Sequence, residues 1–194
     1  IIDLKKKIQL GSIGRIYNVN VFYGNGTSLL VKKSSWKDNG KGVLTDLGSH
    51  IIDILLYIFP KYNFTFDLIH KNSFENKSYD HVFFKTTNTK LKIFCEATLL
   101  SWKNKFYIDV VGEKGSLHLN GLCKWGPSYF THRIRKFPSG VPKENIRKYN
   151  LNDPTWGKEH AYFFKNLNIK NNKFYLRKDL YISKQLQRLI KKKH

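Results

Sequence analysis

Three side chains capable of acid–base chemistry lie close together along one segment of this sequence. Asp46, His50 and Asp53 are spaced four and then three residues apart in the stretch 40–53, GKGVLTDLGSHIID. A helix turns by about 100° per residue, so the three side chains would fall within about 60° of one another. The spacing predicts one polar face that holds a histidine between two carboxylates. The same spacing is also typical of an ordinary amphipathic helix with these residues on its wet side.

The opposite side of this segment is apolar. Five aliphatic residues recur at helical spacing: Leu47, Ile51, Ile54, Leu55 and Ile58. A stripe of this width must be buried against another element. We therefore expect a helix over residues 46–58 that is anchored by its apolar side and exposes the polar trio.

The run WKDNGKGVLTDLGSHIID, residues 36–53, resembles the signature of the Gfo/Idh/MocA oxidoreductases, in which a tryptophan, a glycine pair and a D-x-G-x-H-x-x-D helix occur in this order. The likeness continues through LGSIGRIYNVNVFYGNG upstream and through VVGEKGSLHLNGLCKWGPS and DPTW downstream. It covers nearly the whole chain but only the C-terminal half of a family member. It implies the substrate-binding, oligomer-forming half of an NAD(P)-dependent sugar or sugar-nucleotide dehydrogenase. Segments GLCKWGPS and PSG resemble members from polysaccharide biosynthesis.

The resemblance assigns roles to the polar trio. Oxidation of a secondary alcohol needs a base within reach of the hydroxyl, and histidine titrates near neutral pH, so His50 is the candidate base or hydroxyl ligand. Asp46 would orient the imidazole or bind a neighbouring hydroxyl. Asp53 matches the last acid of the motif as a substrate-binding candidate, although a structural role one turn farther along is the favoured alternative. Trp36 and Lys37 are candidate walls of the substrate site, with surface packing as the alternative.

The dinucleotide-binding half is absent from this sequence. Gly24-Asn25-Gly26 is a near miss to G-x-G-x-x-G, but Leu29 stands where the third glycine belongs and no helical pattern follows directly. The chain begins at Ile1, contains no methionine, and is expected to be a fragment. By the resemblance, NAD or NADP would be bound mainly by an N-terminal Rossmann domain of the same protein, which also supplies a catalytic lysine.

The rest of the chain predicts an α+β fold, a large mainly antiparallel sheet with helices on one face, in a single domain spanning residues 1–194. Alternation and turn residues mark strands at 13–23, 64–70, 81–86, 91–100, 105–112 and 116–120. Consecutive strands joined by short turns are expected to pair antiparallel. The resemblance implies a homo-oligomer whose contact runs through this sheet.

The remaining segments are less regular. Residues 125–149 contain three prolines and are expected to form an extended flap or edge strands. Asp153-Pro154 is a favourable helix start, and Trp156, His160, Phe163, Phe164 and Leu167 would line its apolar face. A last helix over residues 178–192 would bury Ile182, Leu186, Leu189 and Ile190.

The net charge of +21 raises the question of nucleic-acid binding. Only six of the 35 basic residues are arginine, the side chain that recognises bases and phosphates bidentately, and the lysines are spread along the chain. No apolar run is long enough for a membrane span, and no signal peptide opens the chain. We therefore expect no nucleic-acid or membrane partner and a cytoplasmic location, while a basic cleft would attract an anionic substrate.

No metal site is expected. Cys95 and Cys123 match no metal-ligand spacing, and the histidines show no H-E-x-x-H pairing. Arg133, Arg135 and Lys136 are candidates for a diphosphate contact, with a solvated strand edge as the favoured alternative. Two rival functions remain open, namely a binding or assembly domain without catalysis and a basic nucleic-acid binder.

Overall fold

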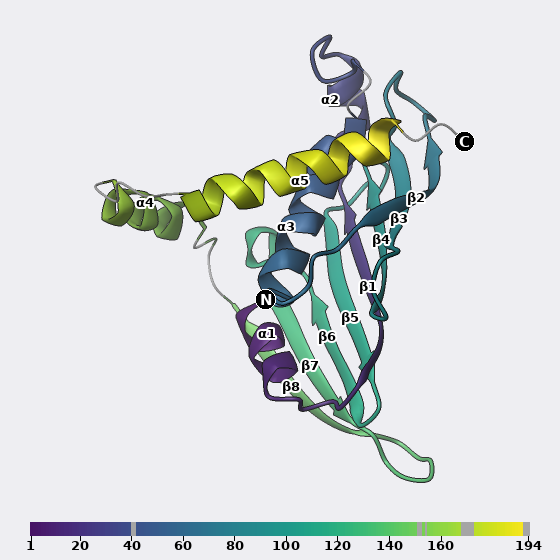
Figure 1. Cartoon of the computed structure of the whole chain (residues 1–194), viewed down its shortest axis with the longest axis vertical. Helices are drawn as coiled ribbons and strands as arrows, with labels where there is room; N and C mark the ends of the chain where they lie inside the picture. The colour runs from purple at the N-terminus through teal and green to yellow at the C-terminus, as the bar shows by residue number, and fades with distance from the viewer. Residues whose placement is uncertain (40–41, 151–152, 154, 168–172, 192–194) are drawn as a thin grey trace.

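The protein, seen here as a computed structural model, is described over residues 1–39, 42–150, 153, 155–167 and 173–191. One eight-stranded sheet forms its body, and helices α1, α3 and α5 lie against one face of that sheet (Figure 1). The strands are β1 (Ile16–Gly24), β2 (Phe66–Asn72), β3 (His81–Thr86), β4 (Lys92–Thr98), β5 (Lys105–Gly112), β6 (Gly115–Asn120), β7 (Ser128–Ile134) and β8 (Lys143–Tyr149). The helical elements are α1 (Ile2–Gln9), α2 (Ser28–Lys32), a π-helical turn (Leu44–Gly48), α3 (Ser49–Ile58), a 3-10 turn (Cys123–Trp125), α4 (Thr155–Asn166) and α5 (Lys173–Lys191). The predicted α+β class is confirmed.

The sheet is antiparallel except at one junction. Its strand order is β2-β3-β4-β1-β5-β6-β7-β8, and β1 pairs parallel with β4 but antiparallel with β5. The antiparallel pairing expected of consecutive strands joined by short turns is confirmed for β3–β4 and for β5–β6, whereas β4 and β5 do not pair because β1 lies between them. Val19 and Val21 of β1 are almost fully buried, as suits a strand in the middle of a sheet.

Alternation along the strands separates a covered face from an open one. Phe106, Ile108 and Val110 of β5 are fully buried under the helices, whereas the residues between them are partly exposed. The helix layer contributes Ile51, Ile52, Leu55 and Ile58 of α3, each no more than 1% exposed. Ile54 was predicted to belong to this stripe but is only partly buried, because Ile52 takes the inward position.

The segment predicted as a flap or edge strands forms edge strands. β7 and β8 pair antiparallel, and the loop between them extends beyond the end of the sheet (Figure 1). β8 is exposed along nearly its whole length, as expected of an edge.

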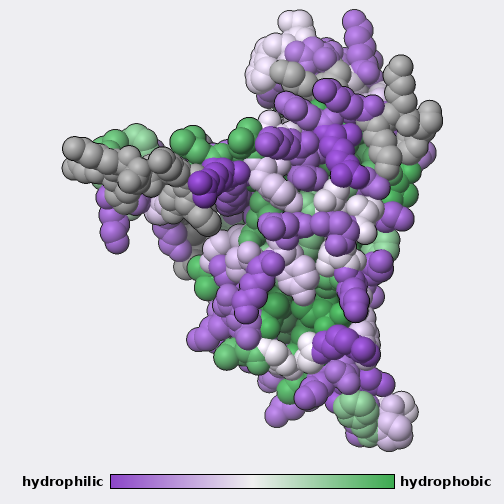
Figure 2. Space-filling view, viewed as in Figure 1, coloured by the Kyte–Doolittle hydropathy of each residue, from purple (hydrophilic) through white to green (hydrophobic). Residues whose placement is uncertain are grey.

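The two C-terminal helices differ in how well they are covered. α5 begins at Lys173, earlier than predicted, and Leu189 is buried while Ile182, Leu186 and Ile190 pack against the core. α4 projects from the body with its predicted apolar side exposed, and Figure 2 shows hydrophobic residues gathered over it. Asp153 caps the start of α4 by accepting the Thr155 backbone N–H at 3.0 Å. Pro154 and the predicted helix end at residue 192 lie outside the described residues.

Removal of one core aromatic should test the division between the two faces. Phe84 of β3 is fully buried under the helices, whereas Phe94 of the neighbouring β4 is 43% exposed on the open face. Phe84→Ala should lower the free energy of unfolding by about 3–5 kcal/mol because it leaves a cavity. Phe94→Ala, the matched control, should cost about 0.5 kcal/mol or less in the monomer. Urea titration measures both, and an equal loss in the two variants would contradict this assignment of faces.

Candidate functional site

The polar trio begins on an irregular helical turn. The chain enters helix at Gly42, passes through the π-helical turn Leu44–Gly48 and continues as α3. The Thr45 hydroxyl donates to the Gly42 carbonyl at 3.1 Å, and the Ser49 hydroxyl donates to the Asp46 carbonyl at 2.7 Å. These contacts satisfy backbone carbonyls in a wide turn, a geometry that occurs frequently at functional sites.

Gly42 fixes where this turn starts. Its φ is +50°, and a Cβ at this position would lie 2.2 Å from the Tyr79 carbonyl oxygen. The same carbonyl accepts the Val43 backbone N–H at 2.8 Å. Only glycine permits this approach, which explains one glycine of the sequence signature and ties the helix start to the β2–β3 connection.

The structure separates Asp53 from the other two members of the trio by giving it a partner on α5. Asp46 and His50 are exposed, as the spacing predicted. Asp53 instead forms an ion pair with Lys178 of α5. No hydrogen bond joins Asp46 to His50 within the described part of the chain, so the orienting role of Asp46 stays a prediction. The contact to α5 supports the structural alternative for Asp53.

Tyr23 is a site residue that sequence reasoning missed. Its ring centroid lies 6.2 Å from that of His50 and 5.7 Å from that of Trp125. Burial raises the pKa of the Tyr23 phenol, and the negative charge of Asp46 raises it further. Tyr23 therefore keeps its proton near neutral pH and can donate a hydrogen bond. The sequence could have indicated this residue, because Tyr23 lies near the end of β1 and on the same face of the strand as the buried Val21.

Trp36, Lys37 and Asp46 line one pocket of about 320 Å³, together with Val31, Gly42, Thr45 and Leu99. The Lys37 ammonium lies 5.2 Å from the Trp36 ring centroid. Trp36 is 71% exposed, which leaves its ring free to contact a ligand. The structure thus brings together three of the five predicted site residues in this pocket; His50 lies beside Tyr23 and Asp53 contacts α5.

The loop that carries Trp36 and Lys37 is held by a carboxylate. Asp38 accepts the backbone N–H of Ser78 at 2.6 Å, the Ser78 hydroxyl at 2.8 Å and the Lys77 N–H at 3.1 Å. Burial pushes the pKa of Asp38 upward, but these three donors outweigh it and lower the pKa. Buried Asp80 accepts the N–H groups of Phe74, Glu75 and Asn76 in turn, so the facing loop is itself ordered.

No cluster of three histidine, cysteine, aspartate or glutamate side chains capable of holding a metal occurs among the described residues. Burial strongly raises the pKa of the Cys95 thiol, which makes this side chain an inert member of the core. Within the described ranges, no helix is long and apolar enough to cross a membrane.

The sequence matches the profile of the Gfo/Idh/MocA oxidoreductase family, C-terminal alpha/beta domain, over residues 5–172. The chain belongs to this family. The signature around Asp46 and His50 and the open-faced sheet are therefore features of a Gfo/Idh/MocA C-terminal domain, and the resemblance seen in the sequence is confirmed. No curated protein sequence matches the chain.

Solved structures share the fold at low sequence identity. A candidate NADPH-dependent oxidoreductase from Desulfitobacterium hafniense is 17% identical with a TM-score of 0.75, over 98% of this chain and 58% of that one. A super-repressor mutant of Gal80p from Saccharomyces cerevisiae is 19% identical with a TM-score of 0.59, over 88% and 50%. The WlbA dehydrogenase from Bordetella pertussis, in complex with NADH and UDP-GlcNAcA, is 21% identical with a TM-score of 0.51, over 62% and 39%. The match thus spans from 39% to 58% of the length of these relatives.

Replacement of Asp38 should loosen the loop beside the pocket. Asp38→Ala removes the acceptor of the Lys77 and Ser78 amides, so hydrogen exchange at these amides should accelerate by about tenfold. The expected acceleration is modest because these hydrogen bonds are partly exposed to solvent. Because the pKa of Asp38 is lowered, protection should persist above the ordinary aspartate value of about 3.9 and vanish as the pH falls through the lowered value. Asp179→Ala removes the same charge from the exposed side of α5 and should leave both amides unchanged. Equal exchange in wild type and Asp38→Ala would refute the anchoring role.

Proposed function

We propose that this chain is the substrate-binding half of an NAD(P)-dependent oxidoreductase that interconverts an alcohol and a ketone on a sugar or sugar nucleotide. The observation that carries this proposal is the convergence of the Trp36–Lys37 loop, Asp46, His50 and Tyr23 at the end of β1. Membership of an oxidoreductase family and the NADH complex of one structural relative support it.

The described residues offer no dinucleotide-binding loop. In the Gly24-Asn25-Gly26 turn, the Asn25 N–H donates to the Thr98 carbonyl, and the Asn25 side chain accepts the Thr27 N–H at 3.1 Å. Trp102 closes over Gly26, where a Cβ would lie 3.1 Å from the tryptophan Cα. Since these groups are already occupied, a pyrophosphate does not fit here. A nicotinamide, which supplies hydride chemistry, would be held by a Rossmann domain outside this chain.

The residues of this chain act on the sugar. His50 accepts the hydroxyl proton of the carbon being oxidised, or returns it in the reverse direction. Asp46 lies close enough to Tyr23 to raise the pKa of its phenol, so the Asp46 carboxyl oxygens and the Tyr23 O–H together offer acceptors and a donor to neighbouring hydroxyl groups. The Trp36 ring and the Lys37 ammonium form the outer wall, where a sugar face or an anionic substituent would bind.

Asp53 has a structural role in this proposal. Its ion pair with Lys178 joins α3 to α5 on the outer side of the helix layer. We assign it to holding the helix that carries His50, in place of the substrate contact implied by the motif.

Assembly would use the open face of the sheet. Phe22 and Tyr107 stack there at 5.4 Å, and Phe94 is 43% exposed. A homo-oligomer would cover these aromatic groups. The polysaccharide pathway and the cytoplasmic location stay predictions from the sequence.

A binding domain without catalysis is the second candidate. It is favoured by the structural likeness to a repressor protein, Gal80p. Sequencing the DNA upstream of this segment distinguishes the two candidates. If it encodes a strand, a G-x-G-x-x-G turn and a helix, the cofactor half is present and the binding domain without catalysis is excluded.

His50→Ala in the intact protein should reduce turnover by about 10² near neutral pH, since it removes the proton acceptor. His70→Ala is the matched control, because His70 is exposed on β2 away from the pocket. Steady-state assays with both nicotinamides measure the effect. An unchanged rate in His50→Ala would leave this residue with a structural role only.

Residues 1–194 alone should oxidise no sugar, because the hydride acceptor has no binding loop here. Nicotinamide reduction followed by absorbance at saturating cofactor and sugar is the assay. Turnover by the isolated chain would show that the proposed division between the two halves is mistaken.

A further inference from the structure

A second cleft lies at the far end of the open face, about 550 Å³ in volume. Its charged lining residues are Arg133, Arg135 and Lys136, and no aspartate or glutamate lines it. Tyr17 at the start of β1 also lines it, whereas Tyr23 at the end of β1 belongs to the candidate sugar site. These tyrosines are six positions apart along the strand, a separation of about 20 Å. The cleft is therefore distinct from the proposed sugar site.

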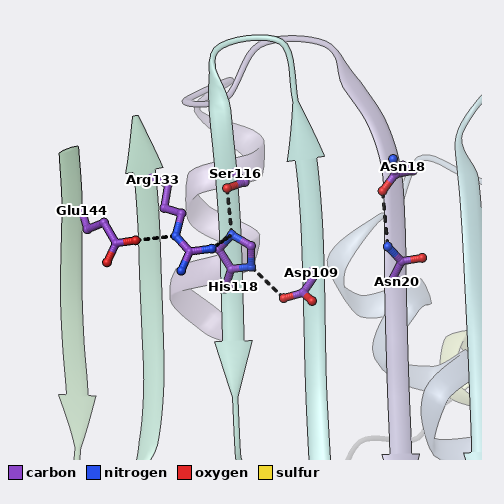
Figure 3. Close-up of polar contacts among 7 residues, drawn as sticks. All are labelled: Asn18, Asn20, Asp109, Ser116, His118, Arg133 and Glu144. Carbon is purple, nitrogen blue, oxygen red and sulfur yellow. Dashed lines mark hydrogen bonds and ion pairs between the residues drawn. The ribbon is translucent and has the colours of Figure 1, made fainter. Parts of the chain in front are cut away.

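Arg133 is held by a row of polar side chains that crosses four strands on the open face (Figure 3). Its Nε donates to Glu144 Oε1 at 2.5 Å, and its Nη1 lies 3.2 Å from His118 Nε2. Arginine can only donate, so His118 Nε2 accepts from it, as it does from the Ser116 hydroxyl at 2.7 Å, and Nδ1 donates to Asp109 Oδ1 at 2.8 Å. Asp109 thus orients His118, and His118 and Glu144 together orient the guanidinium.

The other two cations are held separately. Arg135 donates from Nη1 to the Glu113 carbonyl at 3.1 Å, and its guanidinium lies 4.5 Å from the Phe137 ring centroid. The Lys136 stem lies over Gly140, where a Cβ would come within 2.9 Å of the lysine Cδ. Gly140 has a φ of +141°, so a side chain here would be disfavoured by both space and backbone conformation. The β7–β8 loop is thereby shaped to present Lys136.

Glu144 compensates one of the three cations, and the net charge of about +2 that remains matches a multiply charged anion. Guanidinium groups bind phosphate oxygens in a bidentate manner, and orientation in advance reduces the entropy lost on binding. A ligand with a single carboxylate would compensate only one of the two positive charges that Glu144 leaves. We propose that the cleft formed by Arg133, Arg135 and Lys136 binds a small phosphorylated ligand, at a site separate from the sugar pocket.

Isothermal titration of the intact protein with inorganic phosphate, pyrophosphate and glycerol 3-phosphate tests this proposal. Pyrophosphate should bind most tightly if the ligand carries a diphosphate, and glycerol 3-phosphate if it carries a phosphomonoester. The double variant Arg135→Gln, Lys136→Gln should weaken binding by about tenfold or more, because it removes two charged donors. Arg135→Lys should give an intermediate loss, since it keeps the charge but not the guanidinium fork.

The double variant Lys85→Gln, Lys92→Gln is the matched control. It removes the same two charges from exposed positions on β3 and β4 and should leave the affinity unchanged. Equal weakening in both double variants would show that the net positive charge alone attracts the anions. That result, or the absence of binding of all three probes at millimolar concentration, would overturn the proposal.

Discussion

Burial of one side of the Leu44–Ile58 segment against the sheet is the constraint on which the candidate site depends. Ile51, Ile52 and Leu55 are completely buried, and each contributes about 1.5–3 kcal/mol of hydrophobic stabilisation. Any rotation of α3 that withdrew His50 from the exposed side would bring these aliphatic side chains into water. The position of the polar residues is thus set by the apolar residues behind them.

The same principle explains how far the sequence was informative. Helical spacing correctly placed Leu47, Ile51 and Leu55 inside and Asp46 and His50 outside, because burial selects residue type at a period that local sequence displays. The family signature added a chemical meaning that spacing alone did not provide.

What the sequence did not reveal depends on contacts between distant segments. Tyr23 joins the site only because β1 is inserted between β4 and β5, and no local pattern reports strand order. The ion pair between Asp53 and Lys178 likewise joins two segments that lie far apart in the sequence. Gly42, which precedes the π-helical turn, packs against the Tyr79 carbonyl, and this too is a contact between separate segments. Periodicity predicts where helices and strands form, whereas a functional site also depends on how these helices and strands are arranged in space.

We propose that a sugar binds beside His50 at the end of β1. The most direct test is a structure of the intact protein with a nicotinamide and its sugar substrate. The hydroxyl of the reacting carbon should lie within hydrogen-bond reach of the His50 imidazole, about 2.6–3.2 Å, with Asp46 or Tyr23 on a neighbouring hydroxyl. A sugar bound elsewhere, with His50 and Asp46 facing only solvent, would contradict it.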